Sequence, residues 1–489
     1  MTNAQLCATV TADTTAELRV ARDAAGLEAD LVELRLDSVR DLDLEGALAD
    51  RRTPVLVTCR PRWEGGRFGG SEEERRRILT QALALGAEWV DLEWDGDFGS
   101  LIAERAGRNI VLSSHDFAET PVDLEARCQA MRATGAAVVK LAVFSQSARD
   151  VVRLLELGRA QRGAATVLVG MGPVGVPTRV LPARFGSLWT YAGEGVAPGQ
   201  VSLTDMVRRY RFRRTSSSAA VYGVAGRPIG HSLSPHMHNA GLDAAGLDAV
   251  YVPFEAADAD DLMALLSVLD VAGLSVTAPF KETVLSHVGQ VDGMGQRVGA
   301  VNTLRRDAGA WSGRNTDVPG FLAPLLARGG VAGQRAAVLG AGGSARAVAV
   351  GLASEGAHVT VCARRREQAA PVAQLVSGQV GAFPPPAGSW DLLVNTTPTG
   401  TAPLVANSPV PAVSLTGGHT VYDLVYNPGR TRLLRDAAAA GCRTVGGLDM
   451  LVAQAVRQFE WWFETRPSSE LFKTAALAAL GAHGEEQEA

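Results

Sequence analysis

The sequence predicts an α/β chain: an N-terminal (β/α)8 barrel, followed by a second α/β unit that ends in a nucleotide-binding fold. Two observations carry this prediction. Short apolar runs alternate with helix-length segments over roughly the first 200 residues, which is typical of a barrel of parallel strands. A polar stretch at 208–220 then interrupts the alternation, and a new α/β series begins at residue 221.

The barrel prediction rests on eight apolar segments that have the length of strands. They cover residues 5–10, 30–36, 54–60, 88–93, 109–113, 137–142, 165–170 and 186–191. Polar side chains gather at the C-terminal ends of these runs, where barrels of this type carry their active sites. These side chains are Glu33, Arg35, Arg60, Glu93, His115, Lys140 and Arg179. One of them alone could be a solvated strand end, but seven at one rim indicate a site.

The stretch at 208–220 marks the expected end of the barrel. Its arginines are predicted to form a solvated helix end, and its serines and alanines a linker. Further along, residues 336–363 have the pattern of a strand, a Gly-rich turn, a helix and another strand. We therefore expect a barrel at 1–215, a second domain at 219–321 that is completed by 450–480, and a Rossmann domain at 322–449.

Composition narrows the functional classes. The chain has 489 residues, of which 20% are charged, and a net charge of −5, which excludes a strongly basic nucleic-acid protein and a disordered acidic chain. Five cysteines lie far apart without a Cys-x-x-Cys pair, so neither a disulfide framework nor a zinc site is expected. We see no signal-peptide pattern and no apolar run of transmembrane length. These features favour a cytoplasmic protein that binds neither nucleic acid nor membranes.

Lysine is rare in this chain. Among 47 lysines and arginines, only Lys140, Lys281 and Lys473 are lysines. Biased coding explains such a ratio, but a retained lysine can also mark an amine that must lose its proton, which arginine does not do. Lys140 lies in AAVVKLAVF, as either a snorkelling side chain or a Schiff-base nucleophile in a dry pocket. His115 is a candidate proton carrier, and Glu93 a candidate partner that orients its imidazole.

Seven motifs of the first half follow the order of a known family. They are VELRLD (32–37), TCRP (58–61), VDLEW (90–94), SSHDFAETP (113–121), VKLAV (139–143), RVLPARFGS (179–187) and APGQ (197–200). This part of the chain resembles a type I 3-dehydroquinate dehydratase. The resemblance implies that Lys140 forms an imine with the substrate ketone, that His115 moves the protons and that Glu93 holds His115. It also implies substrate contacts by Glu33, Arg35, Arg60, Arg179 and Gln200.

One position departs from this family pattern. The serine that often precedes the APGQ segment is Val196 here, which removes a hydroxyl contact from the loop that closes over the substrate. We expect weaker closure of the loop or slower turnover.

The turn in VLGAGGSARAVAV (338–350) is a candidate dinucleotide site. Its glycines would let the backbone approach a pyrophosphate at the helix N-terminus, although such a turn can also be purely structural. After the strand at 358–363, where an NAD site has an acidic residue, the chain has Arg364, Arg365 and Arg366. Cations at this place favour the 2′-phosphate of NADP, and a solvated basic turn is the alternative.

A second set of motifs covers roughly 220–475. It comprises GRPIGHSLSPHMHNAG (226–241), SVTAPFKE (275–282), GAVNTL (299–304), GRNTDVPG (313–320), NTTPTG (395–400), YDLVYNP (422–428) and GLDMLVAQA (447–455). These segments resemble a shikimate dehydrogenase. The resemblance implies that Lys281 and Asp317 form the catalytic pair, in which the lysine relays the proton of the hydroxyl being oxidised.

The same resemblance implies two groups of binding residues. The substrate group is Ser232, Ser234, Thr277, Asn302, Tyr426 and Gln454. The NADP(H) group is Gly340, Ala341, Gly342, Gly343, Ser344, Ala345, Arg364, Arg365, Thr396, Gly447 and Met450. The family's asparagine before the first arginine is Ala363 here, so a contact to the adenosine is expected to be lost.

Together the two resemblances predict a bifunctional enzyme of the shikimate pathway of aromatic amino-acid biosynthesis. The first domain would dehydrate 3-dehydroquinate to 3-dehydroshikimate, and the second would reduce that product to shikimate with NADPH. The partners would be these small molecules, and the chain a monomer or homodimer. The contiguous loop spacing of His231, His236 and His238, without paired carboxylates, argues against a metal site.

Two other functions are compatible with the same domains. An NAD-dependent quinate/shikimate dehydrogenase is one, but the Ser232–Ser234 pair and the arginines at 364–366 argue against it. The other is a non-catalytic, metabolite-sensing regulator with the same domains. Such a protein should have lost catalytic residues, whereas Lys140 and Lys281 are both present.

Overall fold

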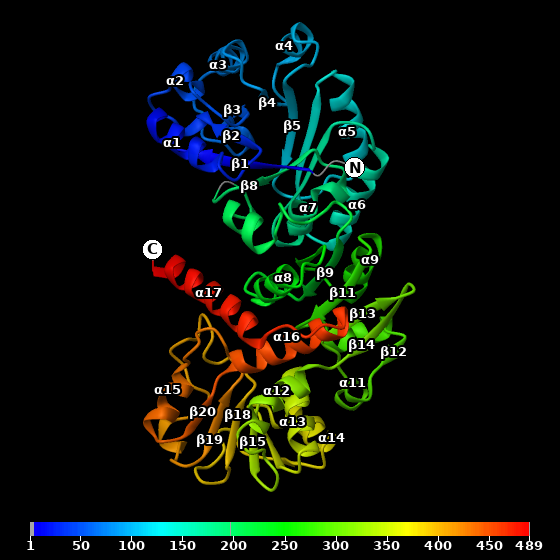
Figure 1. Ribbon diagram of the computed structural model, residues 1–489, viewed down its shortest axis with the longest axis vertical. Helices are drawn as coiled ribbons and strands as arrows, with labels where there is room; N and C mark the ends of the chain where they lie inside the picture. The colour runs from blue at the N-terminus through cyan, green and yellow to red at the C-terminus, as the bar shows by residue number, and fades with distance from the viewer. Residues whose placement is uncertain (1–3, 196, 489) are drawn as a thin grey trace. The chain divides into compact units, whose positions relative to one another are not determined.

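The computed structural model describes residues 4–195 and 197–488, with side chains as far as residue 481 (Figure 1). Val196 lies outside the described residues, so its expected effect on the substrate loop stays a prediction. The chain forms two compact units. Unit 1 comprises Met1–Val221, Pro228–Gly230 and Asp248–Val271, and unit 2 comprises Tyr222–Arg227, His231–Leu247 and Ala272–Ala489.

Unit 1 contains the predicted barrel. Its eight strands pair in the order β7-β6-β5-β4-β3-β2-β1-β8, and a parallel bridge between Thr166 and Ser187 joins the two ends. The strands are β1 (Gln5–Thr11), β2 (Leu31–Arg35), β3 (Val55–Thr58), β4 (Trp89–Glu93), β5 (Ile110–Asp116), β6 (Val138–Phe144), β7 (Thr166–Met171) and β8 (Trp189–Ala192). All eight predicted strands are confirmed.

The barrel helices lie around the outside of the strands (Figure 1). They are α1 (Thr15–Ala25), α2 (Leu44–Leu48), α3 (Glu72–Ala84), α4 (Gly99–Glu104), α5 (Leu124–Ala133), α6 (Ala148–Ala160) and α7 (Val176–Val180). Several begin at a side-chain cap that satisfies free backbone N–H groups. Thr14 caps α1 in this way by accepting from the backbone of Glu17, and Ser71 caps α3.

The alternation of side chains along each strand decides where polar groups point in the barrel. Successive residues of a strand face opposite sides of the sheet, so positions two apart share the interior. In β6, Val138 lies in the buried apolar cluster of the barrel, and Lys140 follows it on the same face. In β5, Val111 lies in that cluster, and Ser113 and His115 follow on its face. The barrel interior is therefore apolar at one end and polar at the C-terminal ends of the strands.

The stretch at 208–220 is less exposed than predicted. A short π-helical turn, η5 (Asp205–Arg209), precedes Arg211, whose exposed fraction is only 6%. Its guanidinium donates to the carbonyl of Ala249, 3.0 Å away, and Arg213 pairs with Asp30 at 2.6 Å. The prediction of a solvated arginine run holds for Arg208, Arg213 and Arg214, which are exposed. It is wrong for Arg211, which donates to a backbone carbonyl of unit 1. Unit 1 also contains β10 (Ala249–Phe254) and α9 (Ala259–Val268).

Unit 2 begins with a mixed sheet. Strands β9 (Ala220–Ala225), β11 (Val271–Val276), β13 (Thr303–Asp307), β14 (Ala310–Arg314) and β12 (Gln290–Val291) are neighbours in this order. The β11–β13 and β13–β14 pairs are antiparallel. The helices of this part are α8 (Ser234–Ala244), α10 (Phe280–Thr283), α11 (Gly293–Val298), α12 (Asp317–Leu326), α16 (Gly447–Phe463) and α17 (Ser469–Glu488).

The rest of unit 2 is the predicted Rossmann fold. Its parallel strands follow the order β17-β16-β15-β18-β19-β20. They are β15 (Arg335–Leu339), β16 (His358–Cys362), β17 (Gln379–Val380), β18 (Leu392–Asn395), β19 (Thr420–Asp423) and β20 (Arg443–Val445). Helices α13 (Gly343–Ser354) and α14 (Arg366–Leu375) share one buried apolar cluster, and α15 (Arg432–Ala439) belongs to another. Helices thus cover both faces of the sheet.

No helix within the described residues is long and apolar enough to cross a bilayer.

Candidate active sites

A cavity of about 570 Å³, open to solvent, lies at the polar end of the barrel. It brings together seven of the predicted dehydratase residues, namely Glu33, Arg35, Arg60, His115, Lys140, Arg179 and Gln200. Glu93 does not line it, whereas Glu64, which sequence analysis did not select, does.

Lys140 is a buried lysine with a buried counter-ion. Its exposed fraction is 5%, and its Nζ donates to Asp91 Oδ2 at 3.1 Å. The same carboxylate pairs with Arg60 at 2.9 Å and accepts from Ser113 Oγ at 2.5 Å. Burial opposes the charge of Asp91, but Arg60 and Lys140 outweigh it and hold the pKa of this carboxyl below its usual value. Asp91 is therefore a carboxylate at neutral pH.

His115 lies at the end of β5 beside Glu64. Its Nδ1 is 3.2 Å from Glu64 Oε1, although the angle falls short of a hydrogen bond, and its backbone N–H donates to the same oxygen at 3.0 Å. Burial, Arg60 and Lys140 together hold the pKa of His115 well below its usual value, so the imidazole is neutral and able to accept a proton. Burial raises the pKa of Glu64 to about 7, against the attraction of Arg60.

Glu93 does not lie beside His115, where the sequence placed it. It pairs with Arg60 Nη1 at 2.8 Å and with Arg75, and no contact with His115 occurs among the described residues. The structure places Glu64 beside His115 instead, because the 3-10 turn η2 (Arg62–Glu64) returns the chain over the strand ends. Glu93 is a fully buried partner of two arginines.

Arg179 is a buried cation that has no carboxylate partner among the described residues. Only 2% of it is exposed, its Nη2 donates to the carbonyl of Pro198 at 3.3 Å, and its Nε has no acceptor. Burial lowers the pKa of Arg179 to about 10. A buried guanidinium with unused donors, facing a cavity, is suited to an anionic ligand.

The remaining barrel residues are held by near neighbours. Glu33 accepts from the hydroxyls of Thr9 and Thr58, each at 2.7 Å. Arg35 forms a two-point pair with Asp37 at 2.8 and 2.9 Å, and Gln200 accepts from the backbone of Ala197 at 3.2 Å.

A second lysine–aspartate pair lies in unit 2. Lys281, on α10, donates from Nζ to Asp317 Oδ2 at 2.5 Å. Asp317 begins α12, and its other oxygen accepts from Asn302 Nδ2 at 2.8 Å. Gln454 Oε1, on α16, lies 3.4 Å from the same nitrogen. The structure thus brings together the predicted pair and two of its predicted substrate residues.

Among the described residues, the other predicted substrate residues make no hydrogen bond with this pair. Ser234 begins α8, and its backbone donates to Ser232 Oγ at 3.3 Å. Thr277 follows β11 and donates its backbone N–H to Ala225 at 2.8 Å. Tyr426 follows β19, and burial raises the pKa of its phenol.

The Gly-rich turn fits a dinucleotide. Gly340 has a φ of 118°, and a Cβ there would meet Thr396 Oγ1 at 2.5 Å, so only glycine suits the position. Gly342 is the N-cap of α13 and offers no side-chain cap, and a Cβ on that residue would meet nothing within 4 Å. The free N–H groups and open space at this helix N-terminus suit a pyrophosphate.

The flanking cofactor positions also fit. Arg364 and Arg365 follow β16, are exposed, and have no ion-pair partner among the described residues. Ala341, Ser344 and Ala345 lie in the turn and the first turn of α13. Gly447 begins α16 where a Cβ would come within 2.2 Å of the carbonyl of Leu424, and Met450 is buried on the same helix. No group of three or more potential metal ligands occurs in the described part of the chain.

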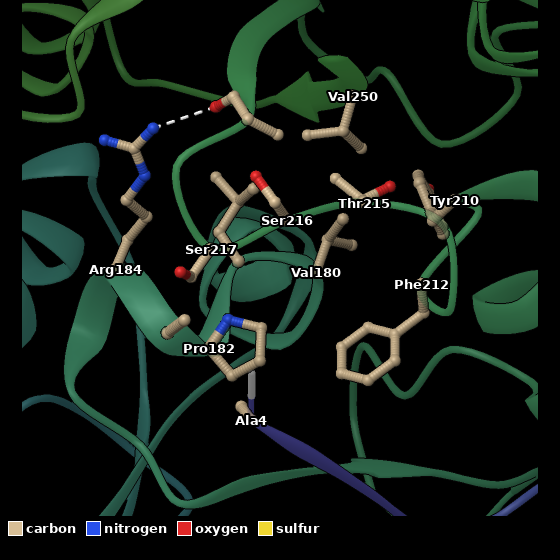
Figure 2. A pocket seen from close by; sticks show the side chains of 13 residues that line it. Ala4, Val180, Pro182, Arg184, Tyr210, Phe212, Thr215, Ser216, Ser217 and Val250 are labelled. Carbon is tan, nitrogen blue, oxygen red and sulfur yellow. Dashed lines mark hydrogen bonds between the residues drawn. The ribbon is translucent and has the colours of Figure 1, made fainter. Parts of the chain in front are cut away.

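Unit 1 has another hollow away from the predicted residues (Figure 2). Its lining is mostly apolar and includes Val180, Tyr210 and Phe212. Arg184, also in the lining, donates to the carbonyl of Ala219 at 2.8 Å, shown as the dashed line. None of the predicted site residues lines this hollow.

Comparison with known proteins finds matches for both parts of the chain. Residues 6–217 match the family model of type I 3-dehydroquinase, residues 224–304 that of the shikimate dehydrogenase substrate binding domain, and residues 447–477 that of the shikimate 5′-dehydrogenase C-terminal domain. A bifunctional 3-dehydroquinate dehydratase/shikimate dehydrogenase of Arabidopsis thaliana, described as chloroplastic, is 34% identical over 96% of this chain and 83% of its own length.

Two further relatives match unit 2 in particular. A shikimate dehydrogenase (NADP(+)) of Symbiobacterium thermophilum is 41% identical over 55% of this chain and 98% of its own length. The crystal structure of a Thermus thermophilus shikimate 5-dehydrogenase with NADP(H) and shikimate is 37% identical, covers 53% of this chain and 99% of that one, and has a TM-score of 0.50. On these findings, the chain belongs to the family of bifunctional 3-dehydroquinate dehydratase/shikimate dehydrogenase enzymes.

Proposed function

We propose that the barrel cavity dehydrates 3-dehydroquinate on Lys140 and that the Lys281–Asp317 site reduces the resulting 3-dehydroshikimate to shikimate with NADPH. The observation that carries this proposal is the grouping of a buried amine, a neutral imidazole and an unpaired buried arginine around one cavity. An anionic ketone is the substrate class that such a set accommodates.

In the dehydratase site, Lys140 Nζ adds to the substrate ketone, and loss of water leaves a protonated imine. This cation withdraws electrons from the neighbouring C–H bond, and the neutral imidazole of His115 takes the proton. The electron pair that remains forms a carbon–carbon double bond as the hydroxyl two carbons from the imine leaves. His115 returns its proton to that hydroxyl, which departs as water, and hydrolysis of the imine frees Lys140 and the product.

Two carboxylates support these steps. Asp91 lies 3.1 Å from Lys140 Nζ and would balance the positive charge of the protonated imine. Glu64, 3.2 Å from His115 Nδ1, would stabilise the imidazolium that forms when His115 accepts a proton. Arg179 would bind the carboxylate of the substrate, because this guanidinium has no acid of its own among the described residues.

In the dehydrogenase site, bound NADPH would supply the hydride, and the chain would supply orientation and a proton. Lys281 would give its proton to the ketone oxygen as that oxygen becomes the hydroxyl of shikimate. Asp317, 2.5 Å away, would direct the lysine at that oxygen. The start of α13 and Thr396 would lie at the pyrophosphate, and Arg364 would pair with the 2′-phosphate.

The domain boundaries at 1–215, 219–321 with 450–480, and 322–449 remain our proposal for the functional division of the chain. We also propose a cytoplasmic enzyme that is a monomer or homodimer, which sedimentation of the purified protein would test.

A coupled assay tests the two activities together. Purified protein receives 3-dehydroquinate and NADPH, and we expect absorbance at the NADPH band to fall without any added enzyme. Borohydride added with substrate should attach the substrate carbons to Lys140, as peptide mass spectrometry would show. Failure to consume NADPH, or labelling at another residue, would contradict the proposal.

A further inference from the structure

Gln458 is a buried amide that joins four segments of unit 2. It lies on α16, one turn after Gln454, and only 1% of it is exposed. Its Oε1 accepts from Ser275 Oγ at 2.7 Å and lies 3.3 Å from His238 Nε2. Its Nε2 donates to the backbone carbonyl of Asn302 and to Thr303 Oγ1, each at 3.2 Å.

The partners of Gln458 fix its orientation. An amide has two donor hydrogens and an oxygen that accepts two bonds, and Gln458 has two partners at each end. Burial lowers the pKa of His238 to about 3, so this imidazole is neutral and can donate its Nε2 hydrogen to Oε1. If the amide were flipped, its nitrogen would face the donors of Ser275 and His238, and its oxygen would face the carbonyl of Asn302. Gln458 is therefore a rigid connector.

The contacts continue from Gln458 to the lysine–aspartate pair. Asn302, whose carbonyl Gln458 holds, donates its side-chain amide to Asp317 at 2.8 Å and accepts from the backbone of Thr316 at 2.7 Å. Thr303, the other partner of Gln458, lies 3.1 Å from Thr316 Oγ1. Asp317 in turn accepts from Lys281. Every link in this series is a hydrogen bond between buried or half-buried groups, where such bonds are stronger than in water.

We propose that Gln458 is a positioning residue of the dehydrogenase: it holds Asn302 so that the Asp317 carboxylate stays directed at Lys281 Nζ. This inference rests on the proposed function of that pair. In the described structure Gln458 makes no hydrogen bond to Lys281 or Asp317, so it would act through Asn302. The position of a proton-relaying group matters steeply, because a displacement of about 1 Å can cost 100-fold in rate.

Gln458→Glu in the full-length protein is the primary test. Glutamate keeps the shape and the acceptor for Ser275, but it removes the donor to Asn302. We expect kcat for shikimate oxidation by NADP+ to fall by about 10- to 100-fold. The KM for NADP+ should stay within about twofold, and the pH profile of kcat should change, because the hydrogen-bond frame around the Lys281–Asp317 pair changes. A kcat and pH profile equal to the unchanged protein's would overturn the inference.

Three controls separate positioning from folding. The dehydratase activity of the same chain reports the amount of folded protein, and it should not change. Gln458→Met, which places no charge in the core, should show the same loss of kcat, and an unchanged kcat in this variant would also overturn the inference. Arg457→Gln alters the exposed neighbour on the same helix and should leave both activities unchanged.

A double-mutant cycle tests the route through Asn302. If Gln458 acts by orienting that amide, Gln458→Glu should lose most of its effect in an Asn302→Ala background. Full additivity would contradict the proposed route. If the unchanged protein itself fails to oxidise shikimate, then the proposed function of the site fails, which is a result distinct from either of these.

Discussion

The two units use the same pair of side chains in unlike surroundings. Lys140 and Asp91 lie 3.1 Å apart in unit 1, and Lys281 and Asp317 lie 2.5 Å apart in unit 2. The first pair is embedded among charges, because Asp91 also binds Arg60. The second has neutral amide neighbours, chiefly Asn302.

This difference follows the chemistry each lysine is proposed to do. A lysine that forms a covalent imine needs a counter-ion for the cation it becomes, and a neutral base nearby. In the barrel, burial together with Arg60 and Lys140 keeps His115 neutral, and the same two cations keep Asp91 ionised. A lysine that only relays a proton leaves the hard chemistry to the cofactor, so one carboxylate and a fixed hydrogen-bond frame suffice.

The largest expected effect comes from replacing Lys140, the lysine that is proposed to form the imine. Lys140→Arg keeps the charge for Asp91 but cannot form an imine, so we expect dehydratase kcat to fall by about 1,000-fold or more, with shikimate oxidation unchanged. Lys473→Arg is the matched control, since Lys473 is partly exposed and pairs with Asp449 at 3.4 Å. Measurable imine trapping in Lys140→Arg would refute the covalent assignment.

The complementary change removes the proton-relaying lysine. In Lys281→Ala we expect shikimate oxidation to fall by about 100- to 10,000-fold, the usual range for a lost proton-transfer group. Dehydration by the same chain should keep its rate, because the residues that line the barrel cavity all belong to unit 1. Loss of both activities, measured in separate assays, would show that the two sites are not independent.

The pH dependence of dehydratase kcat, a smaller effect, tests whether Glu64 or Glu93 supports His115 in the barrel. As pH falls through about 7, Glu64 gains a proton and no longer stabilises the imidazolium of His115, so dehydratase kcat should fall on the acid side with a midpoint near that pH. Glu64→Gln should remove this limb and lower kcat by about 100-fold at pH 8. The pH profile of each variant is the measurement.

The thermal stability of the Glu64→Gln and Glu93→Gln variants is the control for the comparison of these two carboxylates. Burial raises the pKa of Glu64 above its value in the unfolded chain, so its protonated form favours folding, and this contribution is lost as pH rises through about 7. Glu64→Gln should therefore not lower the thermal midpoint at pH 8. Glu93→Gln leaves Arg60 and Arg75 short of a buried partner and should cost about 3–5 kcal/mol. If Glu93→Gln instead removed the acid limb without a loss of stability, and Glu64→Gln lowered stability, then Glu93 would be the residue that supports His115, as the sequence predicted.

The smallest expected effect concerns the cofactor. Arg364 is exposed, so its pairing with a 2′-phosphate is expected to be worth about 1.4 kcal/mol, or tenfold in affinity. In Arg364→Ala we expect KM for NADPH to rise about tenfold and KM for NADH to stay the same. Arg366→Ala, in the same turn, is the comparison variant. Equal use of both cofactors by the unchanged protein would contradict the assignment.

Much of this was predictable because it is local in sequence. All eight barrel strands follow from short apolar runs, and the Rossmann turn from its glycines between a strand and a helix. Lys140 and His115 are predicted from the residues, and the Lys281–Asp317 pair from family resemblance. The structure places Lys140 and His115 in one cavity and joins the pair at 2.5 Å.

The carboxylates that contact Lys140 and His115 could not be predicted in this way, because they are distant in sequence and only the tertiary fold brings them close. Asp91 lies two residues before Glu93 on the same strand, and only the closed barrel shows that its side chain meets Lys140, 49 residues away. Glu64 lies in a 3-10 turn that strand patterns do not select, and the fold carries it 51 residues across to His115. The sequence by itself determined which side chains could do the chemistry, because the functional group of a side chain is set by its residue type. The tertiary structure decided which carboxylate serves which base, because pKa values and orientation come from neighbours that the sequence does not place.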